Sequence, residues 1–197
     1  MICFPENLLL ENERVLLRPL QQEDLPFLLP YADQEPELWT YSAVSAAGRE
    51  GMTKYIEHAL RERAMQKEYP FIIFDKQAGE YAGSSRFYDI QPAFSTTQLG
   101  YTWYGKKFQR SGLNRHCKLL LLGYAFEQWG MERVEFRADL RNEKSVRAMK
   151  QIGCTVEGVL RSHMPVVGGG RRDSIVLSIL KEEWFEFIKK NLQEKIR

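Results

Sequence analysis

A strand–helix–strand pattern in the middle of the chain constrains its fold more than any other feature. Leu99–Tyr104 has the pattern of a strand, Leu113–Trp129 is a long apolar helical run that begins after Gly112, and Arg133–Leu140 alternates like a second strand. A helix between two strands predicts a right-handed crossover that joins parallel neighbours. Ligands in such sheets bind at the carboxyl ends of those strands, where the loop enters the helix. We therefore expect a ligand site at residues 106–115.

Shorter patterns on both sides of this segment predict the remaining elements. Three strands with short connections precede the crossover and imply an antiparallel meander, and a glycine turn at 168–170 predicts a hairpin after it. The sequence thus predicts a single mixed α/β domain over residues 1–197, with a largely antiparallel central sheet and flanking helices. The other predicted strands are Arg14–Leu20, Tyr69–Asp75, Tyr81–Ile90, Val156–Val166 and Asp173–Leu180, and the other predicted helices are Glu23–Ala32, Ser45–Lys67, Asn142–Gln151 and Glu182–Ile196.

Composition argues against several classes of protein. The 28 Lys and Arg residues nearly balance the 26 Asp and Glu residues, so a net charge of +2 does not suit a dedicated nucleic-acid binder. Cys3, Cys117 and Cys154 have spacings that match no zinc or redox motif. We therefore expect reduced thiols in a cytoplasmic compartment and no metal. Since no apolar stretch approaches 18 residues, we expect no membrane span.

The loop at residues 106–115 combines a helix start with positive charge. Gly105 and Gly112 permit tight backbone turns, and the exposed N–H groups of a helix start favour an anion. The loop lacks the Lys and Ser/Thr of a Walker A motif, and it has one glycine where a dinucleotide fingerprint needs three. These residues alone leave open a phosphate site and a solvated basic loop. The cations that could neutralise a diphosphate here are Lys106, Lys107, Arg110 and Arg115.

The segment Gln109-Arg110-Ser111-Gly112-Leu113-Asn114 resembles the diphosphate loop Gln/Arg-x-x-Gly-x-Gly/Ala of the GNAT acetyltransferases. Further segments of the same family agree in order and spacing, and together they resemble the branch related to the ribosomal-protein N-terminal acetyltransferases over residues 12–184. The resemblance implies a GNAT-like fold with a splayed parallel strand pair around the cofactor loop, and it implies acetyl-CoA as co-substrate. These segments are Leu99–Trp103, Asp139–Ser145, Ile152–Cys154, Glu157–Arg161, Arg172-Asp173 and Leu180–Trp184.

The resemblance also implies roles for individual residues. The backbone of the 109–115 loop would hold the CoA diphosphate, strand-edge groups at 101–103 would meet the pantetheine and the thioester carbonyl, and Asn142 would reach the pantetheine arm. The residues expected to contact the cofactor are Tyr101, Thr102, Trp103, Gln109, Arg110, Ser111, Gly112, Leu113, Asn114, Arg115 and Asn142.

Two positions depart from the family pattern. Asn114 occupies the place of a small residue. Met149, seven residues after Asn142, occupies the place where many relatives carry the tyrosine that protonates the leaving thiolate. Ser145 is a substitute for that acid in some relatives, or a first-turn serine of the helix. Glu135 is a candidate general base, or an outward-facing carboxylate of an alternating strand.

The reaction implied by the resemblance is direct attack of a neutral amine on the thioester. Its acceptor would be a protein N-terminus or a small-molecule amine, and a lysine would cost roughly 3.5 kcal/mol more to deprotonate than an α-amino group. A CoA-binding regulatory module with weakened catalysis is the alternative, motivated by Met149 and Asn114. A nucleic-acid binder on the basic loop is a third reading, and a homodimer is left open. The candidate acceptor-site residues are Trp39, Tyr41, Tyr88 and His163.

Overall fold

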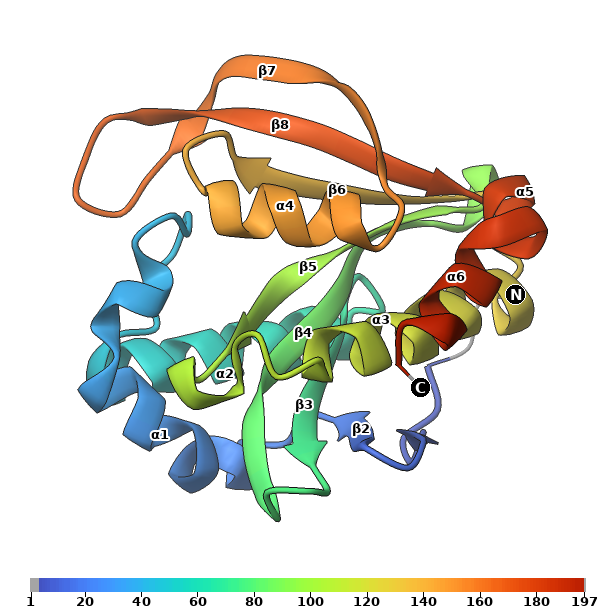
Figure 1. Ribbon diagram of the computed structural model, residues 1–197. Coiled ribbons are helices and arrows are strands. Elements are labelled where there is room, and N and C mark those ends of the chain that lie inside the picture. Colours follow the sequence, from blue (N-terminus) through green and yellow to red (C-terminus); the bar gives the residue numbers. More distant parts are fainter. Residues whose placement is uncertain (1–3, 197) are drawn as a thin grey trace.

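Eight strands form one sheet in the order β1-β2-β3-β4-β5-β6-β8-β7 in the computed structural model, which describes residues 4–196 (Figure 1). Within these residues β5 and β6 are the one parallel pair, and the other neighbours are antiparallel. The strands are β1 (Leu10–Glu11), β2 (Val15–Pro19), β3 (Tyr69–Asp75), β4 (Glu80–Gln91), β5 (Thr96–Tyr104), β6 (Arg133–Asp139), β7 (Thr155–Pro165) and β8 (Arg171–Leu180).

Helices cover both faces of this sheet. In Figure 1 α2 passes behind the sheet, and α3, α4 and the C-terminal helices lie in front. The helices are α1 (Leu25–Gln34), α2 (Gly48–Ala64), α3 (Leu113–Gly123), α4 (Glu143–Gln151), α5 (Lys181–Glu183) and α6 (Lys189–Glu194), with π-helical turns at Tyr124–Gln128 and Trp184–Ile188.

The predicted mixed α/β fold with a largely antiparallel sheet is confirmed, with shifted ends. β5 begins at Thr96 instead of Leu99, because its first three residues pair in parallel with the start of β6. The helix expected over Ser45–Lys67 is shorter at both ends, and Gln66 just beyond it has a φ of 57° that is incompatible with helix. The two-residue strand β1 carries too little sequence pattern to be predicted.

Burial follows the patterns that predicted the elements. β3 is covered on both faces, and six of its seven residues are buried. The buried residues of α2 recur at three and four positions and pack into the core. The C-terminal helices are fixed by Trp184, which is fully buried against Phe126 with ring centroids 5.7 Å apart. The core therefore reaches from α2 through the sheet to the C-terminal segment.

Cys117 and Cys154 are buried free thiols, and burial raises the pKa of each to about 12. Both are therefore protonated and unreactive as nucleophiles at neutral pH. Cys3, the third cysteine, lies outside the described residues. No helix between residues 4 and 196 combines the length and the apolar character needed to cross a membrane.

Candidate active site

A large cleft opens where β5 and β6 diverge. The two strands pair over three residues each, Thr96–Gln98 with Arg133–Glu135, and then separate. Beyond this point no described strand pairs with the β6-facing edge of β5, so its backbone polar groups are available to a ligand. The gap belongs to a cleft of about 1210 Å³ whose walls are β4, β5, β6, α3, α4 and the β7–β8 hairpin. The expected splayed parallel pair is thus present. The paired residues of β5 are 96–98, which precede the strand predicted to begin at Leu99.

A β-bulge shapes the β5 wall of the cleft. One residue of β4, Ser85, lies opposite two residues of β5, Tyr101 and Thr102, and Tyr101 has a φ of 47°. The bulge contacts the side chain of Arg86, which is fully buried and forms an ion pair with Glu68 at 2.5 Å. The Arg86 guanidinium also lies 4.2 Å from the ring centre of Tyr101. Residues 101–103, which are predicted to meet pantetheine, therefore line the cleft. Their bulged conformation is held by the contact between Arg86 and Tyr101.

The loop between β5 and α3 lines the same cleft, and among the described residues no acceptor is recorded for the backbone N–H groups of Arg110, Gly112 and Asn114. Arg110 and Gly112 are both left-handed, with φ of 63° and 89°, and Gly112 has no side chain to cap α3. Such N–H groups, together with a helix start, form an anion site. Tyr104 holds the loop: its carbonyl accepts from Gln109 Nε2 at 3.1 Å, and its hydroxyl donates to Asn114 Oδ1 at 3.2 Å. Asn114, the first departure from the family pattern, thus ties the helix start to β5.

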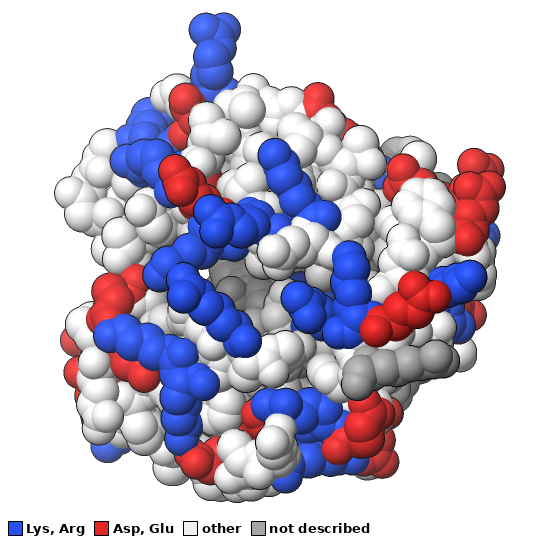
Figure 2. All heavy atoms as spheres, viewed as in Figure 1, with Lys and Arg blue, Asp and Glu red and all other residues white. Residues whose placement is uncertain are grey.

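Positive charge is concentrated around the cleft. Eight Lys and Arg residues line it against three Asp and Glu residues, whereas the whole chain is nearly balanced. Figure 2 shows Lys and Arg side chains around a hollow on this face of the molecule. A cleft lined by one sign of charge attracts a ligand of the opposite sign. The lining cations are Lys106, Arg110, Arg115, Lys118, Arg137, Lys144, Arg147 and Arg172.

The start of α4 forms the wall that faces β5. Asn142 is the N-cap of α4, and its Oδ1 accepts from the Ser145 backbone N–H at 3.1 Å. Ser145 is one of the residues that line the cleft. Met149 lies one turn further along the same wall and is 7% exposed. The wall therefore carries no acidic or basic group at the position where many relatives have tyrosine.

All four predicted acceptor-site residues line the cleft. The rings of Trp39 and Trp103 lie 5.5 Å apart, and the indole N–H of each is buried without a hydrogen-bond acceptor among the described residues. Tyr88 packs edge-on against Tyr101 at 5.1 Å, and burial raises its pKa, so its hydroxyl stays protonated. Tyr41 is 38% exposed at the mouth of the cleft.

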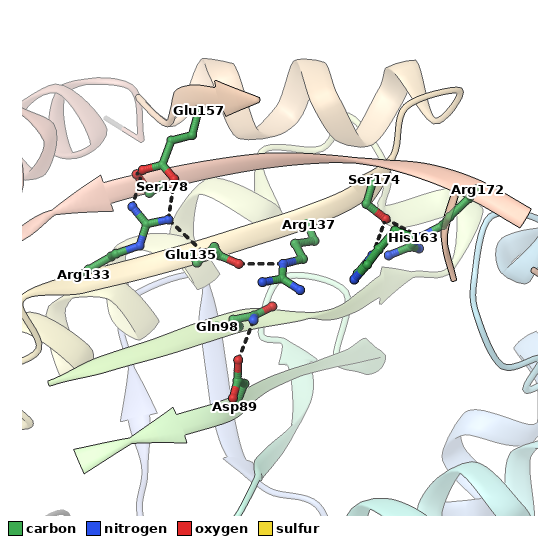
Figure 3. Close-up of polar contacts among 10 residues, drawn as sticks. All are labelled: Asp89, Gln98, Arg133, Glu135, Arg137, Glu157, His163, Arg172, Ser174 and Ser178. Atoms are coloured by element: carbon green, nitrogen blue, oxygen red, sulfur yellow. Dashed lines mark hydrogen bonds and ion pairs between the residues drawn. The ribbon is translucent and has the colours of Figure 1, made fainter. Parts of the chain in front are cut away.

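His163 and Arg172 lie together at the hairpin end of the cleft (Figure 3). His163 Nδ1 lies 2.9 Å from Ser174 Oγ, and Arg172 Nε donates to the same oxygen at 2.9 Å. Burial, together with Arg137 and Arg172, lowers the pKa of His163 below its ordinary 6.5. The imidazole is therefore neutral at pH 7 and can accept a proton.

Three of the predicted residues have side chains that do not line the cleft. Glu135 is held on β6 between Arg133 at 2.8 Å and Arg137 at 2.6 Å, and its side chain is 16% exposed (Figure 3). Leu113 is fully buried in the core, and the Ser111 hydroxyl donates to the Phe108 carbonyl at 2.7 Å. Leu113 and Ser111 can contribute only their backbone to the loop, and the role of Glu135 as a base remains a prediction.

Lys118 is a cleft residue that the sequence patterns did not single out. It lies on the buried face of α3, next to Cys117 and one turn before Leu122, and it is 4% exposed. A lysine on an otherwise apolar helix face was the available signal, because lysine is almost never fully buried without a partner. Lys118 directly precedes four consecutive leucines, and the sequence pattern was interpreted only as a buried core helix.

Comparison with known proteins gives the cleft a family context. The family described as acetyltransferase (GNAT) domain matches residues 14–155. YdaF of Bacillus subtilis, provisionally named a ribosomal N-acetyltransferase, is 31% identical over 106 residues, which cover 54% of this chain and 57% of YdaF. A provisionally assigned acetyltransferase structure from T. thermophilus is 35% identical over the full length of both chains, with a TM-score of 0.88. A GCN5-related N-acetyltransferase structure from Brucella melitensis is 26% identical, covers 99% of this chain and 88% of its own, and has a TM-score of 0.89.

Proposed function

This chain belongs to the GNAT acetyltransferase family, and from that premise we propose that it transfers an acetyl group from acetyl-CoA to the α-amino group of an acceptor by direct attack. The observation that carries the proposal is the single cleft that joins an anion-binding helix start to a neutral histidine. The first suits a diphosphate, and the second suits an amine that must lose a proton.

The chemistry of the cleft fits acetyl-CoA. The N–H groups at the start of α3 and the cations Arg110 and Arg115 would hold the diphosphate, which needs both hydrogen-bond donors and positive charge. The unpaired edge of β5 would bind the amide groups of pantetheine, and the buried Trp103 indole N–H lacks an acceptor that a ligand oxygen can supply. When bound, acetyl-CoA supplies the activated acetyl thioester.

The acceptor end of the cleft favours an amine of low pKa. Arg137 and Arg172 line it, whereas the lining carboxylates Asp89 and Asp139 are already bonded by Gln98 and Arg141. A cationic lysine chain would meet repulsion there, and it also needs more energy to deprotonate than an α-amino group of pKa about 7.7–8.0. We infer that the acceptor is the α-amino group of a protein N-terminus or of a small molecule.

In this scheme His163 accepts the proton that the acceptor nitrogen loses, directly or through a water. The His163→Asn substitution should lower kcat/KM for the acceptor by roughly 10²-fold at pH 7, because a general base contributes at least that much. On the acidic side, measurement across pH, corrected for the neutral fraction of the acceptor, should show the wild-type rate falling below pH 6.5, since the neutral imidazole is the active form and its pKa is lowered. His58→Asn is the control, because His58 does not line the cleft; equal rates for both variants would remove His163 from this role.

The proposed function itself is tested by binding and turnover. Saturating acetyl-CoA should raise the melting temperature, since a ligand that binds the folded state stabilises it by mass action. Release of the CoA thiol should then occur with peptides that have a free N-terminus and should be slower with N-terminally blocked peptides that contain lysine. No stabilisation by acetyl-CoA would contradict the proposal. Stabilisation without thiol release for any α-amine would instead favour a CoA-binding regulatory module.

A further inference from the structure

Lys118 occupies an unusual place for a charged residue. Its side chain is 4% exposed on α3, and among the described residues no carboxylate lies within ion-pair distance. Burial of an ammonium group without a counter-ion is costly, and an apolar side chain of similar length would fill the site more cheaply. The position is therefore poorly explained by stability.

The contacts of Lys118 aim its amine at the divergent part of the sheet. Nζ donates to Thr102 Oγ1 at 3.0 Å, and Thr102 Oγ1 is in turn 2.7 Å from Ser85 Oγ. Nζ also lies 5.6 Å from the ring centre of Phe136 on β6. The amine thus lies between β5 and β6 at the bulge, with one hydrogen-bond donor engaged by these contacts and two remaining.

Lys118 lines the same cleft as Ser145 and Met149, which come from α4 on the other side. The wall of α4 has methionine where an acid is expected from the family pattern, and Lys118 is a proton-bearing group that approaches the cleft from α3. The titratable groups that face it are the thiols of Cys117 on its own helix and of Cys154 just before β7, while Thr102 and Phe136 from β5 and β6 do not titrate.

Burial lowers the pKa of Lys118 to about 8. Cys117 and Cys154 raise this pKa by less than burial lowers it. An acid works best when its pKa lies near the working pH, because it is then protonated and still gives up its proton readily.

We propose that Lys118 is the catalytic acid that protonates the leaving sulfur of CoA. The step rests on the proposed function. The acceptor nitrogen forms a bond to the acetyl carbon, the carbon–sulfur bond breaks, and its electron pair stays on the sulfur. Lys118 Nζ gives one proton to that sulfur and regains one from solvent, while the proton lost by the acceptor nitrogen leaves through His163. The products are an N-acetyl amide and the free CoA thiol.

Activity of two variants tests the proton transfer. The Lys118→Met substitution should lower kcat by roughly 10²-fold or more, while the Kd of acetyl-CoA changes by less than about threefold. Lys118→Arg keeps the positive charge but cannot release a proton, so its kcat should also stay low. The wild-type kcat should fall above pH 8, where Lys118 loses its proton, and this decline should disappear in Lys118→Met. Full activity in either variant would overturn the proposal.

A second readout does not depend on turnover. An ammonium group beside the sulfur should lower the pKa of the thiol of bound CoA below the ordinary value of about 8.5, which ultraviolet absorption of the thiolate measures as a function of pH. This shift should be present in wild type and Lys118→Arg and absent in Lys118→Met. Lys118→Met should also melt no lower than wild type, because it removes a buried charge. An unchanged thiol pKa in Lys118→Met, or loss of the alkaline decline in Ser145→Ala instead, would place the acid elsewhere.

Measurements of acetyl-CoA binding and thiol release by wild type show whether the proposed function or only the role of Lys118 is wrong. If wild type neither binds acetyl-CoA nor releases thiol, the proposed function is wrong. If wild type is active and Lys118→Met has the same kcat and thiol pKa, only the assignment of Lys118 is wrong.

Discussion

The Gly112→Val substitution is expected to weaken acetyl-CoA binding at least about tenfold, which corresponds to about 1.4 kcal/mol. Gly112 has a φ of 89° at the N-cap of α3, where a β-branched residue is strained by roughly 1–2 kcal/mol. Relief of that strain would turn the loop and move the backbone N–H groups of Arg110, Gly112 and Asn114 away from the diphosphate. A new Cβ would meet no atom within 4 Å, so the core should not be disturbed. Isothermal titration of CoA measures the change.

Gly79→Val is the matched control for this experiment. Gly79 also has a positive φ of 68° and open space where a Cβ would lie, but it belongs to the β3–β4 turn outside the cleft. Both variants should lose a similar amount of stability, and only Gly112→Val should lose CoA affinity. If the two variants bind CoA equally well, the loop conformation is not what holds the diphosphate.

The Trp184→Ala substitution is expected to lower the free energy of unfolding by roughly 3–5 kcal/mol. Trp184 is fully buried, stacks on Phe126, and donates from Nε1 to Glu127 Oε1 at 2.9 Å. Its removal leaves a cavity between the C-terminal segment and the π-helical turn that follows α3, and Glu127 Oε1 loses the indole donor. For a domain of this size the melting temperature should fall by about 6–20 °C, as measured by calorimetry.

Phe185→Ala supplies the comparison, because the neighbouring aromatic side chain is 56% exposed. Its substitution should change the free energy of unfolding by no more than about 0.5 kcal/mol. Comparable losses in the two variants would mean that the packing of Trp184 does not anchor the C-terminal segment.

The sequence predicted the elements well where one local pattern dominates. Buried strands such as Tyr69–Asp75 were predicted with their observed ends, because a short apolar run bounded by polar residues has few alternatives. Ends were less certain where pairing decides them. β5 begins at Thr96 since the start of β6 lies beside it, and nothing local to residues 96–98 indicates that partner.

The candidate site divides in the same way. The 109–115 loop is a local feature, because Gly112 and the basic residues are consecutive in the sequence. The contacts of Asn114 and Asn142 could not be predicted from neighbouring residues in the sequence. Asn114 bonds to Tyr104 across the end of β5, and Asn142 serves as the N-cap of α4. Glu135 had the pattern of an outward-facing residue and also of a candidate base, and the structure places it between two arginines of the same strand.

The sequence by itself determined the fold class, the family and the loop at the start of α3, because each depends on short local patterns and on their order along the chain. Only the tertiary structure decided which side chains meet in the cleft. Lys118 comes to Thr102 from another element, and His163 comes to Arg172 across a hairpin. The physical reason is burial: the pKa of Lys118 and of His163 depends on desolvation and on charges brought near by folding, which no local pattern encodes.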